Sequence, residues 1–186
     1  MKIKNIALVG NPNCGKTSLF NTLTGTRQKV ANYAGVTVER KEGSFKLPSG
    51  DAIRVLDLPG TYSLKPSSLD EEVTRAVCLG ELKGEVLPDI FICVVDATNL
   101  SLHLSLVLEV RALNRPMILV LNMMDEVKKR GISIDKDKLS QLLGIPVVEA
   151  VAVKTKGIQD LINQLDQKNL FITPYHSELS HFEQVK

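Results

Sequence analysis

Residues 10–17 constrain this chain more than any other part of its sequence. They read Gly-Asn-Pro-Asn-Cys-Gly-Lys-Thr, they follow an apolar run over residues 3–9, and they lead into a helical pattern over residues 16–23. A glycine turn between a buried strand and a helix lets successive backbone N–H groups face an anion at the helix N-terminus. In this setting the pattern G-x-x-x-x-G-K-T predicts a loop that cradles the phosphates of a nucleotide.

The residues of this loop have different expected roles. Lys16 is expected to reach the β- and γ-phosphates, and Thr17 is expected to ligate Mg²⁺ through its hydroxyl. The loop does not indicate which base the nucleotide carries. The predicted phosphate-binding residues are Gly10, Asn11, Pro12, Asn13, Cys14, Gly15, Lys16, Thr17 and Ser18.

The rest of the chain alternates short apolar strands with amphipathic helices, which is typical of a parallel sheet covered on both faces. We therefore expect an α/β domain of the P-loop NTPase, small-GTPase-like class, with six strands and about five helices. Strands are predicted at residues 3–9, 39–47, 51–58, 90–95, 117–121 and 146–152, and helices at residues 16–23, from residue 68, and at residues 100–113, 135–143 and 158–165. One antiparallel pair is expected, formed by the second and third of these strands. Residues 25–38 are expected to form a long functional loop.

Composition limits the possible functions. The chain has 186 residues, of which 44% are hydrophobic and 24% charged, and its net charge is +2. These values are typical of a soluble globular domain, and so small a charge argues against a nucleic-acid partner. The cysteines Cys14, Cys78 and Cys93 form no C-x-x-C pair. Neither a disulfide framework nor a cysteine metal site is therefore expected.

The apolar runs and the two ends of the chain bear on its organisation. The runs at residues 90–95 and 117–121 are far shorter than the ~20 residues that a membrane helix needs. The N-terminus lacks the features of a signal peptide. We expect residues 1–168 to form one domain and residues 169–186 to be a linker or the start of a truncated helical domain.

A second motif, Asn122-Met123-Met124-Asp125, follows the strand predicted at residues 117–121. It stands in the place of the N-K-x-D motif of GTPases, where a carboxylate can accept hydrogen bonds from the N1–H and 2-amino groups of guanine. Adenine offers neither donor, so a buried carboxylate left unpaired would penalise ATP. Asp125 is thus the predicted base-selecting residue, and Asn122 is expected to brace the loop. The simpler alternative is that N-x-x-D caps a helix.

Two positions depart from the usual guanine motifs. Met123 stands where a lysine is usual, and we therefore expect weaker guanine binding and fast nucleotide exchange. After the last predicted strand, Ala152-Val153-Lys154 stands where Ser-Ala-Lys is usual. The serine is missing, but a backbone N–H to the guanine oxygen and the stem of Lys154 against the base could still contribute.

Two further segments are expected to sense the γ-phosphate. Asp57-Leu58-Pro59-Gly60 fits D-x-x-G at a strand end, so Asp57 would hold the Mg²⁺ shell through water and the Gly60 N–H would contact the γ-phosphate. In the other segment, Thr37 would complete the Mg²⁺ shell only with triphosphate bound. That segment consists of Gly35, Val36, Thr37, Val38 and Glu39. We call residues 31–39 the first switch and residues 57–64 the second switch, since both are expected to relax after hydrolysis.

Thr61 follows the D-x-x-G motif, where Ras-type enzymes carry the glutamine that orients the attacking water. A threonine is too short for that role, so backbone groups or a cation must position hydrolysis instead. Glu71 and Glu72 could help indirectly, although the start of a solvated helix explains them more simply.

Together these motifs resemble the ferrous iron transport protein B (FeoB) family. The most telling stretches are residues 10–17, N-Y-A-G-V-T-V-E at residues 32–39, D-L-P-G-T-Y-S-L at residues 57–64 and N-M-M-D at residues 122–125. The resemblance implies a GTPase domain at the cytosolic face of the bacterial inner membrane. Its partners would be GTP or GDP and the membrane permease region of the same polypeptide, outside this chain, which takes up Fe²⁺.

The resemblance also implies K⁺ as a second metal beside Mg²⁺. Members of the wider group with an asparagine aligned with Asn13 are typically stimulated by K⁺. By resemblance, Asn13 and backbone carbonyls near Ala31 and Tyr33 would ligate K⁺, which would stabilise transition-state charge where other systems use an arginine finger. Intrinsic hydrolysis is expected to be slow. The expected catalytic set is Lys16, Thr37, Gly60 and Asn13.

Two other interpretations stay open. A ribosome-assembly or tRNA-modifying GTPase of the same potassium-stimulated group shares the G-x-P-N-x-G-K-T loop, but no RNA-binding face or appendage is visible in the sequence. A module that binds nucleotide without turnover is disfavoured by the intact residues of the phosphate and Mg²⁺ sites. These residues are Lys16, Thr17, Thr37 and Asp57. The sequence does not decide whether the protein forms a homo-oligomer.

Overall fold

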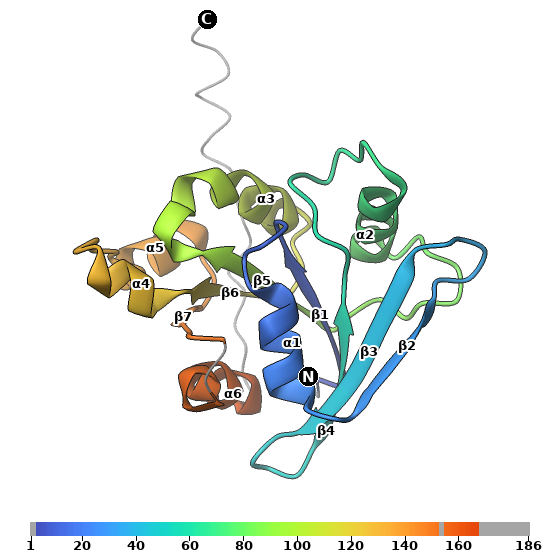
Figure 1. Ribbon diagram of the computed structural model, residues 1–186, viewed down its shortest axis with the longest axis horizontal. Coiled ribbons are helices and arrows are strands. Elements are labelled where there is room, and N and C mark those ends of the chain that lie inside the picture. Colours follow the sequence, from blue (N-terminus) through green and yellow to red (C-terminus); the bar gives the residue numbers. More distant parts are fainter. Residues whose placement is uncertain (1–2, 153–154, 168–186) are drawn as a thin grey trace, which may run out of the picture.

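A seven-stranded sheet forms the centre of the protein, whose computed structural model describes residues 3–152 and 155–167 (Figure 1). The strands are β1 (Asn5–Gly10), β2 (Gln28–Asn32), β3 (Glu39–Lys46), β4 (Ala52–Asp57), β5 (Ile90–Asp96), β6 (Met117–Asn122) and β7 (Val147–Glu149). They lie in the order β2-β3-β4-β1-β5-β6-β7. All neighbours from β4 to β7 pair in parallel.

Helices cover both faces of this sheet. In the described residues they are α1 (Lys16–Thr24), α2 (Leu69–Leu79), α3 (Leu100–Ala112), α4 (Met124–Lys129), α5 (Lys136–Leu143) and α6 (Gln159–Asp166), with short 3-10 turns at Ala97–Asn99 and Thr155–Ile158. Leu8 belongs to the core under α1 and α6, and its neighbour Val9 belongs to the core under α2, α3, α4 and α5. This alternation follows from the two-residue period of a strand and explains why β1 is apolar throughout.

The predicted α/β class with helices on both faces is confirmed, but the number of strands is not. There are seven strands, because residues 28–32, predicted as part of a long loop, form β2. β2 pairs antiparallel with β3, and β3 with β4, so two antiparallel pairings replace the one expected. Every residue of β2 is exposed. A strand exposed on both faces has no alternating apolar pattern that sequence analysis could detect.

One helix was not expected, and one strand is shorter than expected. α4 was not predicted, because its six residues are too few to show a helical period. The last strand is confined to Val147–Glu149 instead of residues 146–152. Its partner β6 ends at Asn122, which leaves the later residues without a strand to pair with. The tail predicted at residues 169–186 lies outside the described residues.

The capping signal at residue 68 is confirmed as the start of α2. The Ser68 hydroxyl accepts a hydrogen bond from the Glu71 N–H at 3.3 Å. The Glu71 carboxylate accepts from the Ser67 N–H at 2.8 Å and from the Ser67 hydroxyl at 2.6 Å. The bond to Ser68 satisfies an N–H that a helix start otherwise leaves unpaired, and the bonds from Ser67 fix the residue before the cap. Glu71 therefore helps to shape the segment that joins the second switch to α2.

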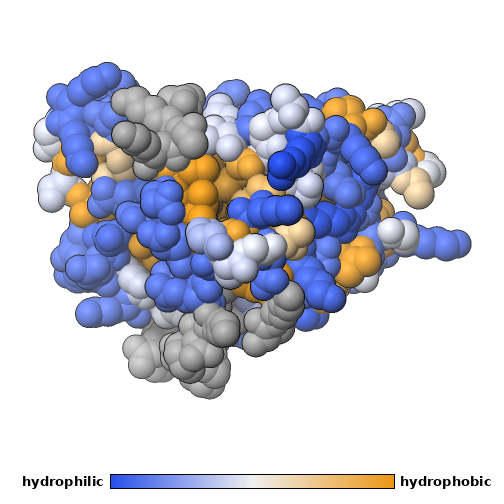
Figure 2. Space-filling model, turned by 90° about the horizontal axis from the view of Figure 1, so that it is seen from below, coloured by the Kyte–Doolittle hydropathy of each residue, from blue (hydrophilic) through white to orange (hydrophobic). Residues whose placement is uncertain are grey.

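The two long apolar runs are internal strands. β5 and β6 lie inside the sheet and nearly all of their residues are buried. The longest helix in the described part of the chain, α3, has 13 residues, and none there has the length and apolar character needed to cross a bilayer. Figure 2 shows one face of the molecule, on which hydrophilic residues predominate and apolar residues gather near the centre.

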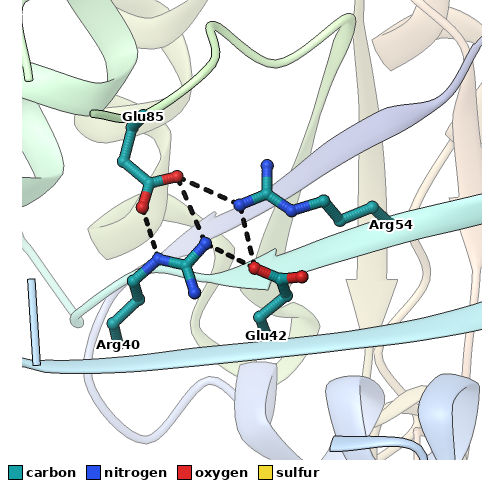
Figure 3. A network of polar contacts seen from close by, with 4 residues as sticks. All are labelled: Arg40, Glu42, Arg54 and Glu85. Carbon is teal, nitrogen blue, oxygen red and sulfur yellow. Dashed lines mark hydrogen bonds and ion pairs between the residues drawn. The ribbon is translucent and has the colours of Figure 1, made fainter. Parts of the chain in front are cut away.

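A network of four charged side chains fixes the end of the first switch (Figure 3). Arg40 and Glu42 lie in β3, Arg54 lies in β4, and Glu85 lies in the loop between α2 and β5. Arg40 pairs with both carboxylates, and Arg54 donates to Glu42 at 2.9 Å and to Glu85 at 3.2 Å. The network therefore holds the strand that follows the first switch against the loop that follows α2.

This network predicts a loss of stability in acid. The hydrogen bond from Arg54, with that from Arg40, lowers the pKa of Glu42 from 4.5 to about 2. Because the pKa falls on folding, the stabilisation by Glu42 is fully present above about pH 4.5 and is lost as the pH falls towards 2. We expect Glu42→Gln to lower the free energy of unfolding at pH 7 by about 1 kcal/mol, allowing for solvent screening. Urea denaturation at pH 7 and pH 2.5 should show the difference from the unmutated protein shrinking in acid.

The matched control is Glu39→Gln, whose side chain is 54% exposed and pairs only with Lys41 at 3.3 Å in the described part of the chain. This change should alter the free energy of unfolding much less. A Glu42→Gln effect of the same size at both pH values would show that the charge of Glu42 does not stabilise the fold.

Candidate nucleotide-binding site

The predicted phosphate loop joins β1 to α1 and takes a conformation that few residues allow. Gly15 has φ +87°, and a Cβ added there would lie 2.1 Å from Nδ2 of Asn122. Asn13 also has a positive φ, of 63°, in the left-handed region that asparagine tolerates better than most residues. The glycine at position 15 is therefore needed both for the backbone turn and for the close approach of the guanine motif.

Cys14 lies inside the loop, away from solvent. It is 1% exposed, and burial raises the pKa of its thiol to about 11. The thiol therefore stays protonated at neutral pH and brings no negative charge next to the phosphates. Cys78 and Cys93 are also free and buried, and burial raises the pKa of each thiol.

Three side chains predicted to hold the phosphates and Mg²⁺ lie together. Lys16 Nζ forms an ion pair with Asp57 Oδ1, and Thr17 Oγ1 donates to Asp57 Oδ2 at 3.1 Å. The side chains of Lys16 and Asp57 are only 9% and 3% exposed. Charges so buried need partners of opposite sign. They meet because α1 follows β1, β4 ends at Asp57, and the two strands are neighbours in the sheet.

A cavity of about 230 Å³ opens beside these three residues. Residues of both switches line it, among them Val38 and Gly60. The hydroxyl of Thr17 and the carboxylate of Asp57 are hard oxygen ligands of the kind that Mg²⁺ prefers, so the residues present fit this ion. Thr37 is exposed and is not part of the cavity wall.

Asn122 connects the phosphate loop to the loop after β7. Its side chain is buried; Nδ2 donates to the Cys14 carbonyl at 2.9 Å, and Oδ1 accepts from the Ala152 N–H at 2.9 Å. The N-cap of α4 is Met123, and no side chain caps this helix. The helix-cap alternative therefore does not account for Asn122. The Ala152 N–H is thus already bonded to Asn122, and the contact of a backbone N–H of residues 152–154 with the guanine oxygen stays a prediction.

Asp125 lies in the first turn of α4, and the preceding Met123 has a φ of 61°. Asp125 is partly exposed and lines a cavity of about 290 Å³ between α4, the end of β7 and the start of α6. Asp125 is thus accessible to a ligand in this cavity. Val153 and Lys154, two residues of the predicted third guanine contact, lie outside the described residues.

The first switch closes the hairpin of β2 and β3. The Tyr33 N–H donates to Val38 O at 3.0 Å, and the Val36 N–H donates to Tyr33 O at 3.2 Å. Tyr33 is 2% exposed and lies in the same core cluster as Val38. Ala31 pairs with Arg40 in the β2–β3 ladder. No hydrogen bond in the described part of the chain joins Asn13 to the other two predicted K⁺ ligands.

The second switch packs directly on the phosphate loop. The Thr61 N–H donates to Gly10 O at 3.1 Å, and a Cβ added to Gly60 would lie 3.1 Å from the Pro12 nitrogen. The Thr61 side chain is fully buried, and its hydroxyl donates to Ser63 O at 2.6 Å. The residue at the position of the usual glutamine therefore points into the protein.

Two residues that contact the second switch were missed by sequence analysis. Thr74 of α2 donates through its hydroxyl to Pro59 O at 2.9 Å. Glu109 of α3 accepts hydrogen bonds from Ser63 and Leu64. Neither belongs to a local motif, and each meets its partner only because the helices fold back over the sheet. No signal in the sequence indicated them.

Comparison with known proteins identifies the chain. The family model described as ferrous iron transport protein B matches residues 4–165. The chain belongs to the FeoB family. Among FeoB relatives, the Fe(2+) transporter FeoB of Salmonella typhimurium is 46% identical, and that of Escherichia coli (strain K12) is 45% identical. Each match covers 99% of this chain and 23% of the relative, so the chain spans about a quarter of their length.

Solved structures of FeoB proteins place the chain within this family's architecture. The cytosolic domain of L. pneumophila FeoB has a TM-score of 0.85 and 42% identity, covering 97% of this chain and 76% of that one. The G domain of T. maritima FeoB has a TM-score of 0.77 and 46% identity, covering 88% of this chain and 99% of that one. This chain therefore contains the FeoB G domain with its P-loop GTPase fold, as the resemblance predicted.

Proposed function

We propose that this chain binds and hydrolyses GTP as the G domain of a ferrous iron transporter. The proposal is carried by the joint placement of Lys16, Thr17 and Asp57 on one cavity that both switches line. A cation, a hydroxyl and a carboxylate in these positions are what binding of a magnesium nucleotide by a P-loop requires. Two T. maritima FeoB structures, described as a GDP form and a GMPPNP form, support the choice of ligand.

Different residues of the site are proposed to contact the phosphates and Mg²⁺. Lys16 exchanges its pairing with Asp57 for the β- and γ-phosphates, while backbone N–H groups of the loop surround them. Thr17, and Asp57 through water, would hold Mg²⁺, and Thr37 would complete its shell when triphosphate is bound. Bound Mg²⁺ neutralises charge on the phosphate oxygens. The Gly60 N–H donates to the γ-phosphate, which makes the second switch sensitive to the presence of that group.

Asp125 selects guanine through two accepted hydrogen bonds, and this choice can be tested directly. Phosphate release by the purified chain should be at least 100-fold faster, as kcat/KM, with GTP than with ATP, because a carboxylate without donors opposite it disfavours adenine. Equal rates would reject the role of Asp125. A chain that binds neither nucleotide would reject the proposed function as a whole.

A monovalent cation is proposed to assist hydrolysis, with Asn13 and backbone carbonyls near Ala31 and Tyr33 as its ligands. Replacing Na⁺ by K⁺ at constant ionic strength should raise kcat for GTP about tenfold or more, because a fixed positive charge stabilises the charge of the transition state. Asn13→Ala should remove the stimulation. The control Asn21→Ala, on the exposed side of α1, should keep it. Equal turnover in the two salts, or stimulation that survives Asn13→Ala, would contradict the proposal.

The cellular role follows from the family. We assign the chain to Fe²⁺ uptake at the cytosolic face of the bacterial inner membrane, with the permease region of the same polypeptide as its partner. The relatives, of which this chain covers 23%, have room for such a region. Nucleotide-driven movement of the two switches would be the signal passed to it. The small net charge of +2 gives no reason to include a nucleic-acid partner.

A further inference from the structure

Glu109, in the second half of α3, contacts the second switch although it lies far from it in sequence. Its two carboxylate oxygens lie 3.0 and 2.9 Å from the Ser63 hydroxyl, which donates to them, and Oε2 also accepts from the Leu64 N–H. We infer that Glu109 is a positioning residue that holds the second switch where the Gly60 N–H can meet the γ-phosphate of GTP. The inference rests on the proposed GTPase function.

The chemistry of this contact suits an anchor. A carboxylate that accepts from a hydroxyl and a backbone N–H forms charge-assisted hydrogen bonds, which are about twice as strong as neutral ones. Glu109, Ser63 and Leu64 are all partly buried, so water competes less for these bonds than it would on an open surface. In the described part of the chain Glu109 forms no salt bridge. The partners of its charge are therefore those on the switch.

Glu109 contacts the second switch just after Gly60 and can therefore affect the position of the Gly60 amide. Before Gly60, the loop is held by α2, because the Thr74 hydroxyl donates to Pro59 O at 2.9 Å. After Gly60, it is held by α3 through Glu109. Gly60 thus lies between two anchored points, directly against the phosphate loop. If the Glu109 contact is lost, the Thr61 N–H still donates to Gly10 O and the Thr61 hydroxyl still donates to Glu71. Residues 63 and 64, however, lose their anchor to α3, so the Gly60 amide is held less firmly at the γ-phosphate position.

A purely structural role for Glu109 would have a different consequence. Loss of a structural contact would lower stability and would weaken GDP and GTP binding alike. Loss of a positioning contact acts on the Gly60 amide, whose expected partner is the γ-phosphate alone. The ratio of the dissociation constants for GTP analogue and GDP therefore separates the two roles.

The experiment compares Glu109→Gln with the unmutated chain in Mg²⁺ and K⁺. We expect the Kd for GMPPNP to rise about tenfold and the Kd for GDP to change less than twofold, since one charge-assisted anchor is lost. At saturating GTP, kcat should fall by a similar factor. Ser63→Ala removes one donor but leaves the Leu64 N–H, and it should give a smaller change in the same direction. The control Glu81→Gln removes an exposed carboxylate that pairs with Arg75 at 3.3 Å and should change neither Kd.

The melting temperature of each variant without nucleotide checks its folding, and Ser63→Ala keeps the test valid if Glu109→Gln does not fold. Equal losses of GDP and GMPPNP affinity, or no loss of either, would overturn the positioning role. A failure of the unmutated chain to bind either nucleotide would instead reject the proposed function. The double variant Glu109→Gln/Ser63→Ala should be no weaker than Glu109→Gln alone, because both changes break the same anchor.

Discussion

Lys16→Ala is expected to lower kcat/KM for GTP by at least 10²–10³-fold, which is the size of effect seen when a single preorganised stabilising group is removed from an active site. The ammonium of Lys16 is the buried cation of the phosphate cavity, and its side chain is only 9% exposed. Without it, the other lysine that lines the cavity is Lys41, which is 35% exposed and paired with Glu39, so the negative charge that develops on the phosphates loses its buried cation. Phosphate release and GDP binding, measured over a wide range of nucleotide concentration, test this expectation.

The same substitution also leaves the carboxylate of Asp57 unpaired in a buried setting, which itself lowers stability. Thermal unfolding must therefore be measured beside activity, and Lys16→Met, which keeps an unbranched apolar side chain, offers a second variant. Lys46→Ala changes the net charge equally at an exposed position of β3 and should leave turnover unchanged. A folded Lys16→Ala chain with turnover within tenfold of normal would show that Lys16 does not stabilise the reaction.

Asp125→Asn is expected to change which base the site accepts. Guanine offers two donors to a carboxylate, whereas an asparagine amide offers one acceptor and one donor, so one hydrogen bond is replaced by two facing donors. GTP affinity should fall about 10²–10³-fold. Xanthine carries an oxygen where guanine carries its amino group and therefore matches asparagine. The affinity for xanthosine triphosphate should rise.

Competition binding with GTP, ATP and xanthosine triphosphate measures this change directly. Glu126→Gln is the matched control, since Glu126 is the next residue of α4 and pairs with Lys129 at 2.6 Å. It should keep the preference for GTP. If Asp125→Asn weakens all three nucleotides equally, Asp125 supports the fold of the loop and does not read the base.

The fold class and the outline of the site could be predicted because they depend on short contiguous patterns. β5 and β6 are apolar runs bounded by turns, which is the usual sequence pattern of a parallel strand buried on both faces. The phosphate loop needs glycine at position 15 for steric reasons, and such a requirement is visible in one sequence. The proposal that Asp125 reads the base likewise comes from its place just after a strand, which one sequence also shows.

The features that escaped prediction depend on contacts between distant segments or on the absence of a pattern. β2 is held by backbone pairing with β3, and its exposed side chains carry no information about that pairing. Glu109 resembles any partly exposed acid on a helix, and its partner Ser63 is 46 residues away. The Asn122 side chain bonds both to the Cys14 carbonyl and to the Ala152 N–H. The second bond cannot be predicted without knowing where the loop after β7 lies.

The burial of Tyr33 sets a thermodynamic threshold for the first switch. Its side chain shares a core cluster with Val73 and Val77 of α2, the helix that follows the second switch. Moving the switch so that this ring enters water would expose apolar area worth about 2 kcal/mol. The Tyr33 hydroxyl, which has no hydrogen-bond partner in the described part of the chain, would gain one from water and offset part of that cost. The net cost is therefore at most roughly a factor of thirty in the equilibrium between two switch conformations. A ligand whose preference for the second conformation exceeds that factor would make it the major one. Withdrawal of the ring would also remove a member of the core cluster that α2 shares, which would couple the two proposed switches through the core.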